Sequence, residues 1–277
     1  MTPTLPINRG LMIKAFREVW GTTLLLGIVL LLVETALSYV LPKFHEQLSA
    51  QWSAMPFVQN IIKAMLGADV SGGIGPETFA AMAWVHPVVL ACVWAHAIVI
   101  CTRVPAGEVD RGTIDVLLGL PVSRWQVYIS ETAVWLAAAV FILLLAFLGN
   151  AIGSTGVPTE FRLDKARIGM VLVNLLCMYV SVGSFALLVS ALSDRRGRAI
   201  TLVFLVVLGS FLLNYLAEFW EPLSRFAFLS VLKYYRPLQV VRDGHWPWRD
   251  LAILLTTAIG FWTAGGVIFS RRDLTTV

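Results

Sequence analysis

Few residues of this sequence have the types and spacing that chemistry requires. The most conspicuous is Glu34, a carboxylic acid in the middle of a long apolar run. A carboxylate at membrane depth is energetically costly, so it is a candidate for a substrate path. The alternative is a protonated or hydrogen-bonded glutamate that faces a helical bundle or a partner subunit. The sequence leaves both interpretations open.

Metal-ligating and nucleophilic residues are sparse. His86 and His96 are ten residues apart, which is not the i, i+3 or i+4 spacing that brings two imidazoles together on a helix. Cys92, Cys101 and Cys177 lie in apolar runs without CxxC spacing, so we expect them to fill the protein interior. A membrane-embedded enzyme is an alternative class, but the sequence has no HExxH, no G-x-S-x-G and no cluster of paired aspartates. We therefore predict no catalytic residue and no metal site.

The composition indicates an integral membrane protein. Of the 277 residues, 58% are hydrophobic and only 14% are charged, whereas a soluble domain carries about 25% charged residues. A helix needs roughly 20 apolar residues to cross a bilayer, and six segments qualify. We predict a single all-α domain over residues 1–277, a six-helix bundle with spans near 22–41, 80–101, 127–149, 169–192, 199–217 and 251–269.

The residues before the first span predict a helix that lies in the membrane surface. Met12, Phe16 and Trp20 recur at i, i+4 and i+8, which gathers apolar side chains on one face, and Asn8 is expected to cap the helix. The basic residues divide almost evenly between the two sides of the membrane. The short loop SDRRGR, residues 193–198, nevertheless concentrates arginines, and short loops dominate the positive-inside rule. We therefore expect both termini in the cytoplasm.

The stretch GEVDRGTIDVLLGLPVSRWQVY, residues 107–128, carries more charge and more turn signals than a short connection between two spans needs. Thr113 is expected to be the N-cap of a short helix whose Ile114, Leu117 and Leu118 share one face, with Asp115 pointing away. Gly119 is expected to end that helix in the left-handed conformation.

A second helix is predicted directly after this turn. Ser123 and Gln126 have the S-x-x-Q spacing of a capping box, and Val122 and Val127 fall at the positions of a hydrophobic staple. Because such features contribute on the order of 1 kcal/mol each, they fix the angle between the short helix and the third span. A well-capped loop at the membrane surface would show the same local signals.

The segment resembles the cytoplasmic coupling segment of ABC-2 type permeases, the membrane subunits of a large class of ABC transporters. Its pattern of an acidic residue, Gly-Thr, a leucine-rich turn and Pro-Val-Ser-Arg matches Glu108, Arg111, Gly112, Thr113, Leu117, Leu118, Pro121, Val122, Ser123 and Arg124. The basic N-terminal helix, the six spans and the C-terminal FSRRDL also recur in that family. Glu131 departs from it, because relatives often carry a lysine shortly after this motif.

The resemblance implies that two permease subunits pair, as two copies or with a homologous permease, and that each docks a separate ATP-binding subunit in a bacterial inner membrane. ATP and Mg²⁺ would be bound by that partner, because this chain has no G-x-x-x-x-G-K-[ST] motif and no cofactor motif of its own. The residues expected to couple to the ATPase are Glu108, Asp110, Arg111, Gly112, Thr113, Asp115, Leu117, Leu118, Pro121, Ser123 and Arg124. Leu117 and Leu118 are the expected apolar anchors, and the charged residues form the rim.

The function predicted from this resemblance is the permease subunit of an ATP-driven exporter. An ATP-independent secondary transporter is an alternative, but it calls for internal repeats and interrupted spans, and only Pro87 breaks a span. The family moves lipids, polysaccharides, drugs and peptides and includes permeases for nitrous-oxide reductase maturation. No residue of this sequence indicates which of these substrates or roles applies. The net charge of +4 suits anionic membrane lipids, and no motif indicates nucleic-acid binding.

Two further features of the sequence allow predictions. The connection from Glu218 to Asp250 alternates aromatic and charged residues, which favours a belt at the outer membrane surface over an exit gate. Gly149 and Gly153 form a GxxxG at the end of the third span, where the motif is expected to matter little.

Overall fold

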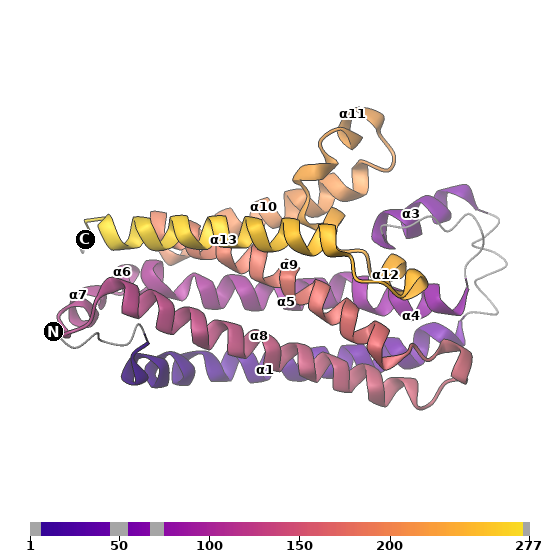
Figure 1. The fold of residues 1–277 in the computed structure, drawn as a ribbon, viewed down its shortest axis with the longest axis horizontal. Helices are drawn as coiled ribbons and strands as arrows, with labels where there is room; N and C mark the ends of the chain where they lie inside the picture. Colours follow the sequence, from indigo (N-terminus) through magenta and orange to yellow (C-terminus); the bar gives the residue numbers. More distant parts are fainter. Residues whose placement is uncertain (1–6, 45–54, 67–74, 274–277) are drawn as a thin grey trace.

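The protein is described by a computed structural model that covers residues 7–44, 55–66 and 75–273. The regular elements of these residues are all helical. The long helices run side by side along one axis and form an elongated bundle (Figure 1). The predicted all-α class is therefore confirmed.

Six helical segments among the described residues are long and apolar enough to cross a membrane. They are α1 (Arg9–Lys43), α4 with α5 (Pro76–Val85 and Pro87–Cys101), α8 (Arg124–Ser154), α9 (Lys165–Leu192), α10 (Arg196–Leu216) and α13 (Trp248–Arg271). Each corresponds to one of the six predicted spans. Most extend a few residues beyond the predicted ends, because polar residues of the first and last turns continue the helices.

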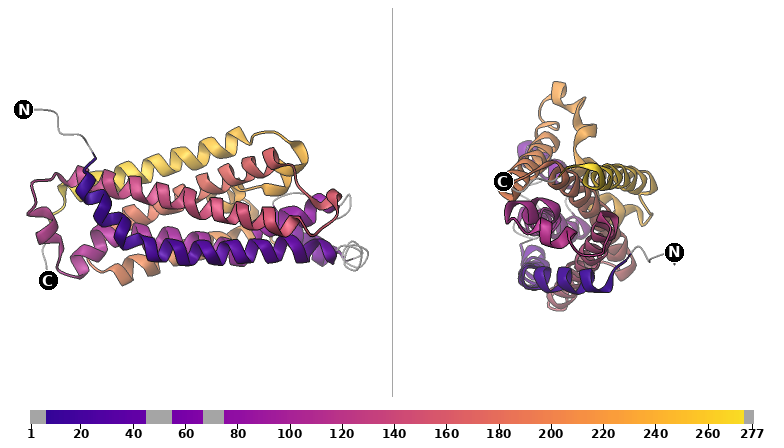
Figure 2. Two further views of the ribbon diagram at one scale, coloured as in Figure 1. Left: turned by 90° about the horizontal axis from the view of Figure 1, so that it is seen from below. Right: turned by 90° about the vertical axis from the view of Figure 1, so that its left-hand side faces the viewer.

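Helix α1 corrects the prediction of a separate surface helix before the first span. It is continuous over 35 residues, about 52 Å at 1.5 Å per residue, which exceeds the roughly 30 Å of the hydrocarbon core. Its first turns bend away from the rest of the helix (Figure 2). There Phe16 and Trp20 are exposed, as a surface helix requires, and Asn8 caps the helix by accepting from the backbone N–H of Gly10.

The second span is divided at His86. Pro87 lacks a backbone N–H, so the helix cannot continue through it, and α5 begins at Pro87 after α4 ends at Val85. The ring of His86 caps the new helix, because its Nδ1 accepts from the N–H of Val88 at 3.4 Å. The interruption predicted at Pro87 is present.

Helix α1 packs along α8, and α9 packs along α13 (Figures 1 and 2). The α1–α8 contact depends on Gly149 and Gly153: a Cβ on either residue would collide with the backbone carbonyl oxygen of Leu31 or Thr35, respectively. The expectation that this GxxxG matters little was wrong, because α1 extends far enough to pack against the end of α8. Small residues let two membrane helices approach this closely.

The short elements gather at the two ends of the bundle. One end holds η1 (Arg103–Gly107), α6 (Glu108–Asp110) and α7 (Ile114–Leu118) together with the beginning of α1 and the end of α13 (Figure 1). The other end holds α3 (Pro56–Leu66), η2 (Thr159–Phe161), α11 (Glu221–Ser224), η3 (Ala227–Leu229), η4 (Val231–Tyr234) and α12 (Pro237–Asp243). The candidate site lies at the first of these ends.

Candidate functional site

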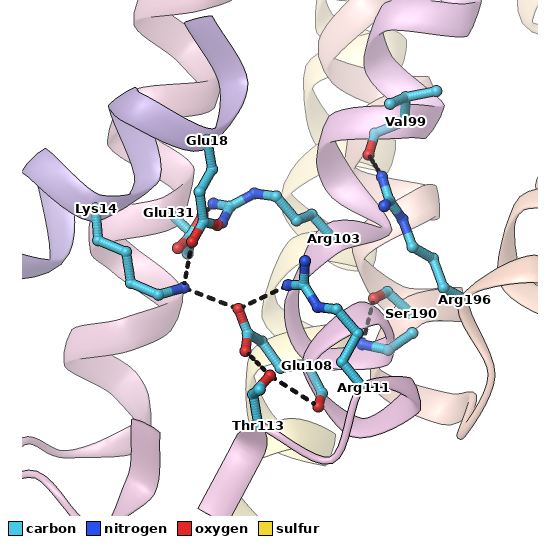
Figure 3. A network of polar contacts seen from close by, with 11 residues as sticks. Lys14, Glu18, Val99, Arg103, Glu108, Arg111, Thr113, Glu131, Ser190 and Arg196 are labelled. Carbon is cyan, nitrogen blue, oxygen red and sulfur yellow. Dashed lines mark hydrogen bonds and ion pairs between the residues drawn. The ribbon is translucent and has the colours of Figure 1, made fainter. Parts of the chain in front are cut away.

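Glu108 is the centre of a polar network at the end of the bundle that carries α6 and α7 (Figure 3). Its side chain is only 3% exposed, and one carboxylate oxygen accepts from Lys14 Nζ at 2.8 Å and from Arg111 Nη2 at 3.0 Å. The hydroxyl of Thr113 donates to the other oxygen. Burial by itself would raise the pKa of Glu108, but the bonds from Lys14 and Thr113 and the nearby Arg111 charge outweigh it and hold the pKa below its usual value.

The turn between α6 and α7 differs in detail from the prediction. Gly112 adopts a positive φ of 67°, which a residue without Cβ adopts readily. Thr113 stands at the N-cap position of α7, but its hydroxyl bonds the Glu108 carboxylate and makes no cap bond. Gly119 ends α7 with φ −72°, so the predicted left-handed terminator was wrong and the left-handed glycine precedes the helix.

A second cluster of charges joins three elements beside Glu108. The guanidinium of Arg103 in η1 binds the carboxylates of Glu18 in α1 and Glu131 in α8, and Lys14 bonds Glu18 at 3.0 Å. Arg103 is only 5% exposed, so its charge is compensated by these carboxylates within the protein. Glu131, the departure from the family pattern, is thus the α8 partner of a buried arginine.

The beginning of the segment and η1 directly before it are also bonded to α10 and α9, respectively. The N–H of Ala106 donates to Ser190 Oγ at 3.1 Å, and Asp110 accepts from the backbone N–H of Arg196 at 3.4 Å. The guanidinium of Arg196 donates to the carbonyl of Val99 at 2.9 Å (Figure 3). The segment is therefore bonded to the first residues of α10, and η1 is bonded to the last turn of α9.

The end of the segment joins α8 through the predicted capping box. Ser123 Oγ accepts from the N–H of Gln126 at 3.1 Å, and the N–H of Ser123 donates to Gln126 Oε1 at 2.9 Å. Arg124, the first residue of α8, donates to the carbonyl oxygens of Phe269 and Arg272 at the end of α13. The exposed Pro121 separates α7 from this cap.

The two faces of α7 have different environments. Ile114 and Leu117 are buried against the bundle, and Leu118 packs partly against the same core. The exposed residues are Val116, which is 74% exposed, Leu120, which is 49% exposed, and the charged residues Asp110, Arg111 and Asp115. In this structure Leu117 is thus held within the chain, and Val116 and Leu120 are the apolar side chains that face outward.

Lys14, Glu18 and Arg103 are members of this site that the sequence did not indicate. Their signal was weak: each is a charged residue close to the predicted cytoplasmic end of a span. Such residues usually face water or headgroups, and nothing in their local sequence indicates an ion-pair partner on another helix.

Glu34 and the histidines lie apart from this network. Glu34 is fully buried in α1, and neither carboxylate oxygen has a hydrogen-bond partner in the described part of the chain. His96 is buried between Thr23 and Tyr179, with ring nitrogens 3.1 Å and 2.8 Å from their hydroxyl oxygens. This polar chain links α1, α5 and α9, whereas His86 serves as the cap of α5.

Comparisons with known proteins show the family of the chain. The model of a family described as "ABC-2 family transporter protein" matches residues 11–274, nearly the whole chain. This chain belongs to the ABC-2 transporter family. It is similar to the uncharacterized membrane protein YdbK of Bacillus subtilis (strain 168), with 29% identity over 197 residues that cover 65% of this chain and 77% of the relative. No solved structure matches the chain.

Family membership identifies the chain as a membrane permease component of an ABC transporter. The six candidate spans agree with this assignment. The resemblance of the Gly107–Tyr128 segment to the coupling segment of ABC-2 permeases is consistent with the match over the whole chain.

Proposed function

We propose that this ABC-2 permease is the substrate-conducting subunit of an ATP-driven exporter and that α7 docks a separate ATP-binding subunit. The observation that carries the proposal is the construction of α7. Val116 on its outward face and Leu120 directly after it are exposed beside charged residues. The elements directly before α7 are bonded to the spans, α6 to α1 through Glu108 and η1 to α9 through Ala106. A helix that only closed a loop would need neither the exposed apolar side chains nor the bonds to the spans.

The outward face of α7 has the character of a small docking surface. Interfaces commonly combine a desolvated apolar centre with a polar rim. Val116 and Leu120 supply the apolar centre here, and Asp115, Asp110 and Arg111 supply the rim. This assignment moves the anchor from Leu117 and Leu118, which pack inward, to their exposed neighbours.

The elements that flank α7 provide a route for movement. Glu108 connects the segment to α1 through Lys14, and the capping box connects it to α8 through Ser123. Ser190 and Arg196 add α9 and α10. When the ATPase pair closes on ATP and displaces α7, these bonds pass the displacement to four spans, which can shift a bundle between two arrangements.

The remaining parts of the assembly follow from the same proposal. The coupling end faces the cytoplasm of a bacterial inner membrane, with both termini on that side. A second permease, either another copy or a homologue, completes the path, and ATP with Mg²⁺ is bound by the ATPase. Glu34 contributes to the substrate path only when the bundle opens around it, because its carboxylate is fully enclosed in this arrangement.

The orientation is tested by labelling. With Cys92, Cys101 and Cys177 replaced by alanine, an Asp115→Cys variant in right-side-out vesicles should resist a membrane-impermeant maleimide and react once the vesicles are opened. A Trp220→Cys variant, at the exposed opposite end, should react in intact vesicles. The reverse pattern would put α7 outside the cell and exclude docking.

Docking is tested by co-purification with a candidate ATP-binding subunit, chosen among neighbouring reading frames for the presence of a Walker A motif. Val116→Asp should abolish co-purification without changing the amount of membrane-inserted protein, because it places a charge at the centre of the proposed interface. Trp220→Asp is the control, because it introduces the same charge at an exposed apolar site far from α7. Full retention of the ATPase by the Val116 variant would refute the proposed contact.

A further inference from the structure

A groove opens between α10 and α13 on the side of the bundle opposite to the α1–α8 pair. Both helices pack on α9, and the hollow between them has a volume of about 440 Å³. Its floor includes Val182 and Phe185 of α9, and its walls include Val206 of α10 and Phe261 of α13. The volume falls in the range of about 300–1,000 Å³ that small-molecule sites occupy.

Three of the four hydroxyl groups that line this groove, those of Ser210, Tyr234 and Thr257, form hydrogen bonds within the protein. Thr257 donates to the carbonyl of Ile253 at 2.7 Å, and Ser210 Oγ accepts from the N–H of Val231 at 3.0 Å. The groove therefore presents a mainly hydrocarbon surface. Along α13 its lining runs from Ile253 to Phe261, a rise of about 12 Å, which lies within the roughly 15 Å depth of one leaflet.

A second, polar hollow of about 590 Å³ adjoins the groove at the end of the bundle away from α7. Phe228 and Tyr234 line both hollows, and the Tyr234 hydroxyl donates to the carbonyl of Phe228 at 2.8 Å, which fixes this shared wall. Trp246 and Trp248 are stacked with ring centroids 5.6 Å apart at the polar hollow. Tryptophans favour the membrane–water interface, so this hollow lies at headgroup level.

The charges of the polar hollow leave cations available. Lys233, Arg236 and Arg249 line it together with Asp243 and Asp250. Arg236 lies 3.8 Å from Asp250, and the charge of Arg249 also acts on Asp250, whereas Lys233 forms no ion pair with a described residue. The three cations of the hollow exceed its two carboxylates. An aromatic belt alone would account for these residue types, but it would not place them around a hollow that continues into an apolar groove.

We propose that the two hollows form one binding site for a membrane phospholipid, with an acyl chain in the α10–α13 groove and the phosphate beside Lys233 and Arg249. The occupant is a lipid because the site is apolar at membrane depth and basic at headgroup level. A free anion would gain nothing from the groove, and a second protein chain would not need the basic hollow. The site lies at the opposite end from α7 and does not depend on ATPase docking.

The test uses phosphatidylglycerol with a photoactivatable acyl chain in vesicles that contain the intact protein. Cross-linked peptides should concentrate on the groove-lining parts of α9, α10 and α13. Diacylglycerol with the same chain, which lacks the phosphate, should label the groove at least about tenfold less, as expected for the loss of attraction to two cations. An excess of inorganic phosphate should not reduce the labelling.

Two pairs of variants separate the parts of the site. Lys233→Gln with Arg249→Gln should reduce phosphatidylglycerol labelling about tenfold, whereas Arg225→Gln, an exposed arginine that lines neither hollow, should not. Thr257→Trp should fill the groove and abolish labelling, and Ile259→Trp, 62% exposed on the same helix, is its control. Melting temperatures of all variants confirm that they fold.

Three results would overturn the proposal. The first is equal labelling by the lipid and by diacylglycerol, which would remove the role of the phosphate. The second is labelling spread evenly over other exposed faces, such as that of Leu205 on α10. The third is a disulfide between two Thr257→Cys chains, which would show that a second copy occupies the groove.

Discussion

Lys14 and Glu108 are 94 residues apart in the chain, yet the ammonium of Lys14 lies 2.8 Å from the carboxylate of Glu108. This ion pair joins the first turns of α1 to the segment that carries α7. Glu108 was expected to offer its charge to a partner, but its side chain is only 3% exposed. Its negative charge is therefore directed inward, and it fastens α7 to the bundle.

The first prediction concerns the coupling between these two residues. We expect Lys14→Met and Glu108→Gln each to destabilise the protein by about 2 kcal/mol, a figure kept low because Lys14 is partly exposed. The double variant should lose clearly less than the sum, because each single change already removes the Lys14–Glu108 ion pair. Thermal unfolding in nanodiscs measures this cycle, with Arg17→Met as the control. Strictly additive losses would contradict the pairing.

The second prediction is a pH dependence that originates at Glu108. Its pKa in the folded protein lies below the usual glutamate value of 4.5, so the ionised form is favoured by folding. The resulting stability is fully present above pH 4.5 and is lost as the pH falls through the lowered pKa. We expect the melting temperature of the native chain to fall below pH 4.5 more steeply than that of Glu108→Gln. Parallel curves for the two proteins would exclude this contribution.

The third prediction concerns the cap between α7 and α8. Ser123→Ala removes the side-chain acceptor for the Gln126 N–H, which should cost about 1 kcal/mol and loosen the angle between the two helices. We expect co-purification with the ATPase to persist while substrate stimulation of ATP hydrolysis falls. Docking uses the exposed face of α7, whereas the cap transmits the movement of α7 to α8. Ser154→Ala, at the other end of α8, should leave both unchanged. Loss of co-purification in the Ser123 variant would mean that the cap serves docking itself.

The features that could be predicted from the sequence are those that local patterns determine. Six apolar runs predicted six spans, and Ser123 with Gln126 predicted a capping box that is present. The predicted short helix begins at Ile114, directly after the expected cap at Thr113. Each of these depends on residues within a few positions of one another, so one sequence is enough to indicate them.

The partners of the charged residues could not be predicted in the same way. Arg103 binds Glu18 and Glu131 because α1, η1 and α8 meet at one level with particular rotations. Those rotations are set by packing over whole helices, which no local pattern specifies. The inward direction of Leu117 has the same origin, since an apolar residue on a short helix can face either a partner or the chain's own bundle.

The last prediction concerns the close contact of α1 with α8. Gly153→Ala places a methyl group against the carbonyl oxygen of Thr35, so the helices must separate, and we expect a loss of about 1–3 kcal/mol. Gly260→Ala in α13 is the matched control, because a Cβ there meets no atom within 4 Å. That change should leave the melting temperature unchanged or slightly higher, since alanine favours helix over glycine. If both variants melted together, the α1–α8 contact would not be as close as this structure has it.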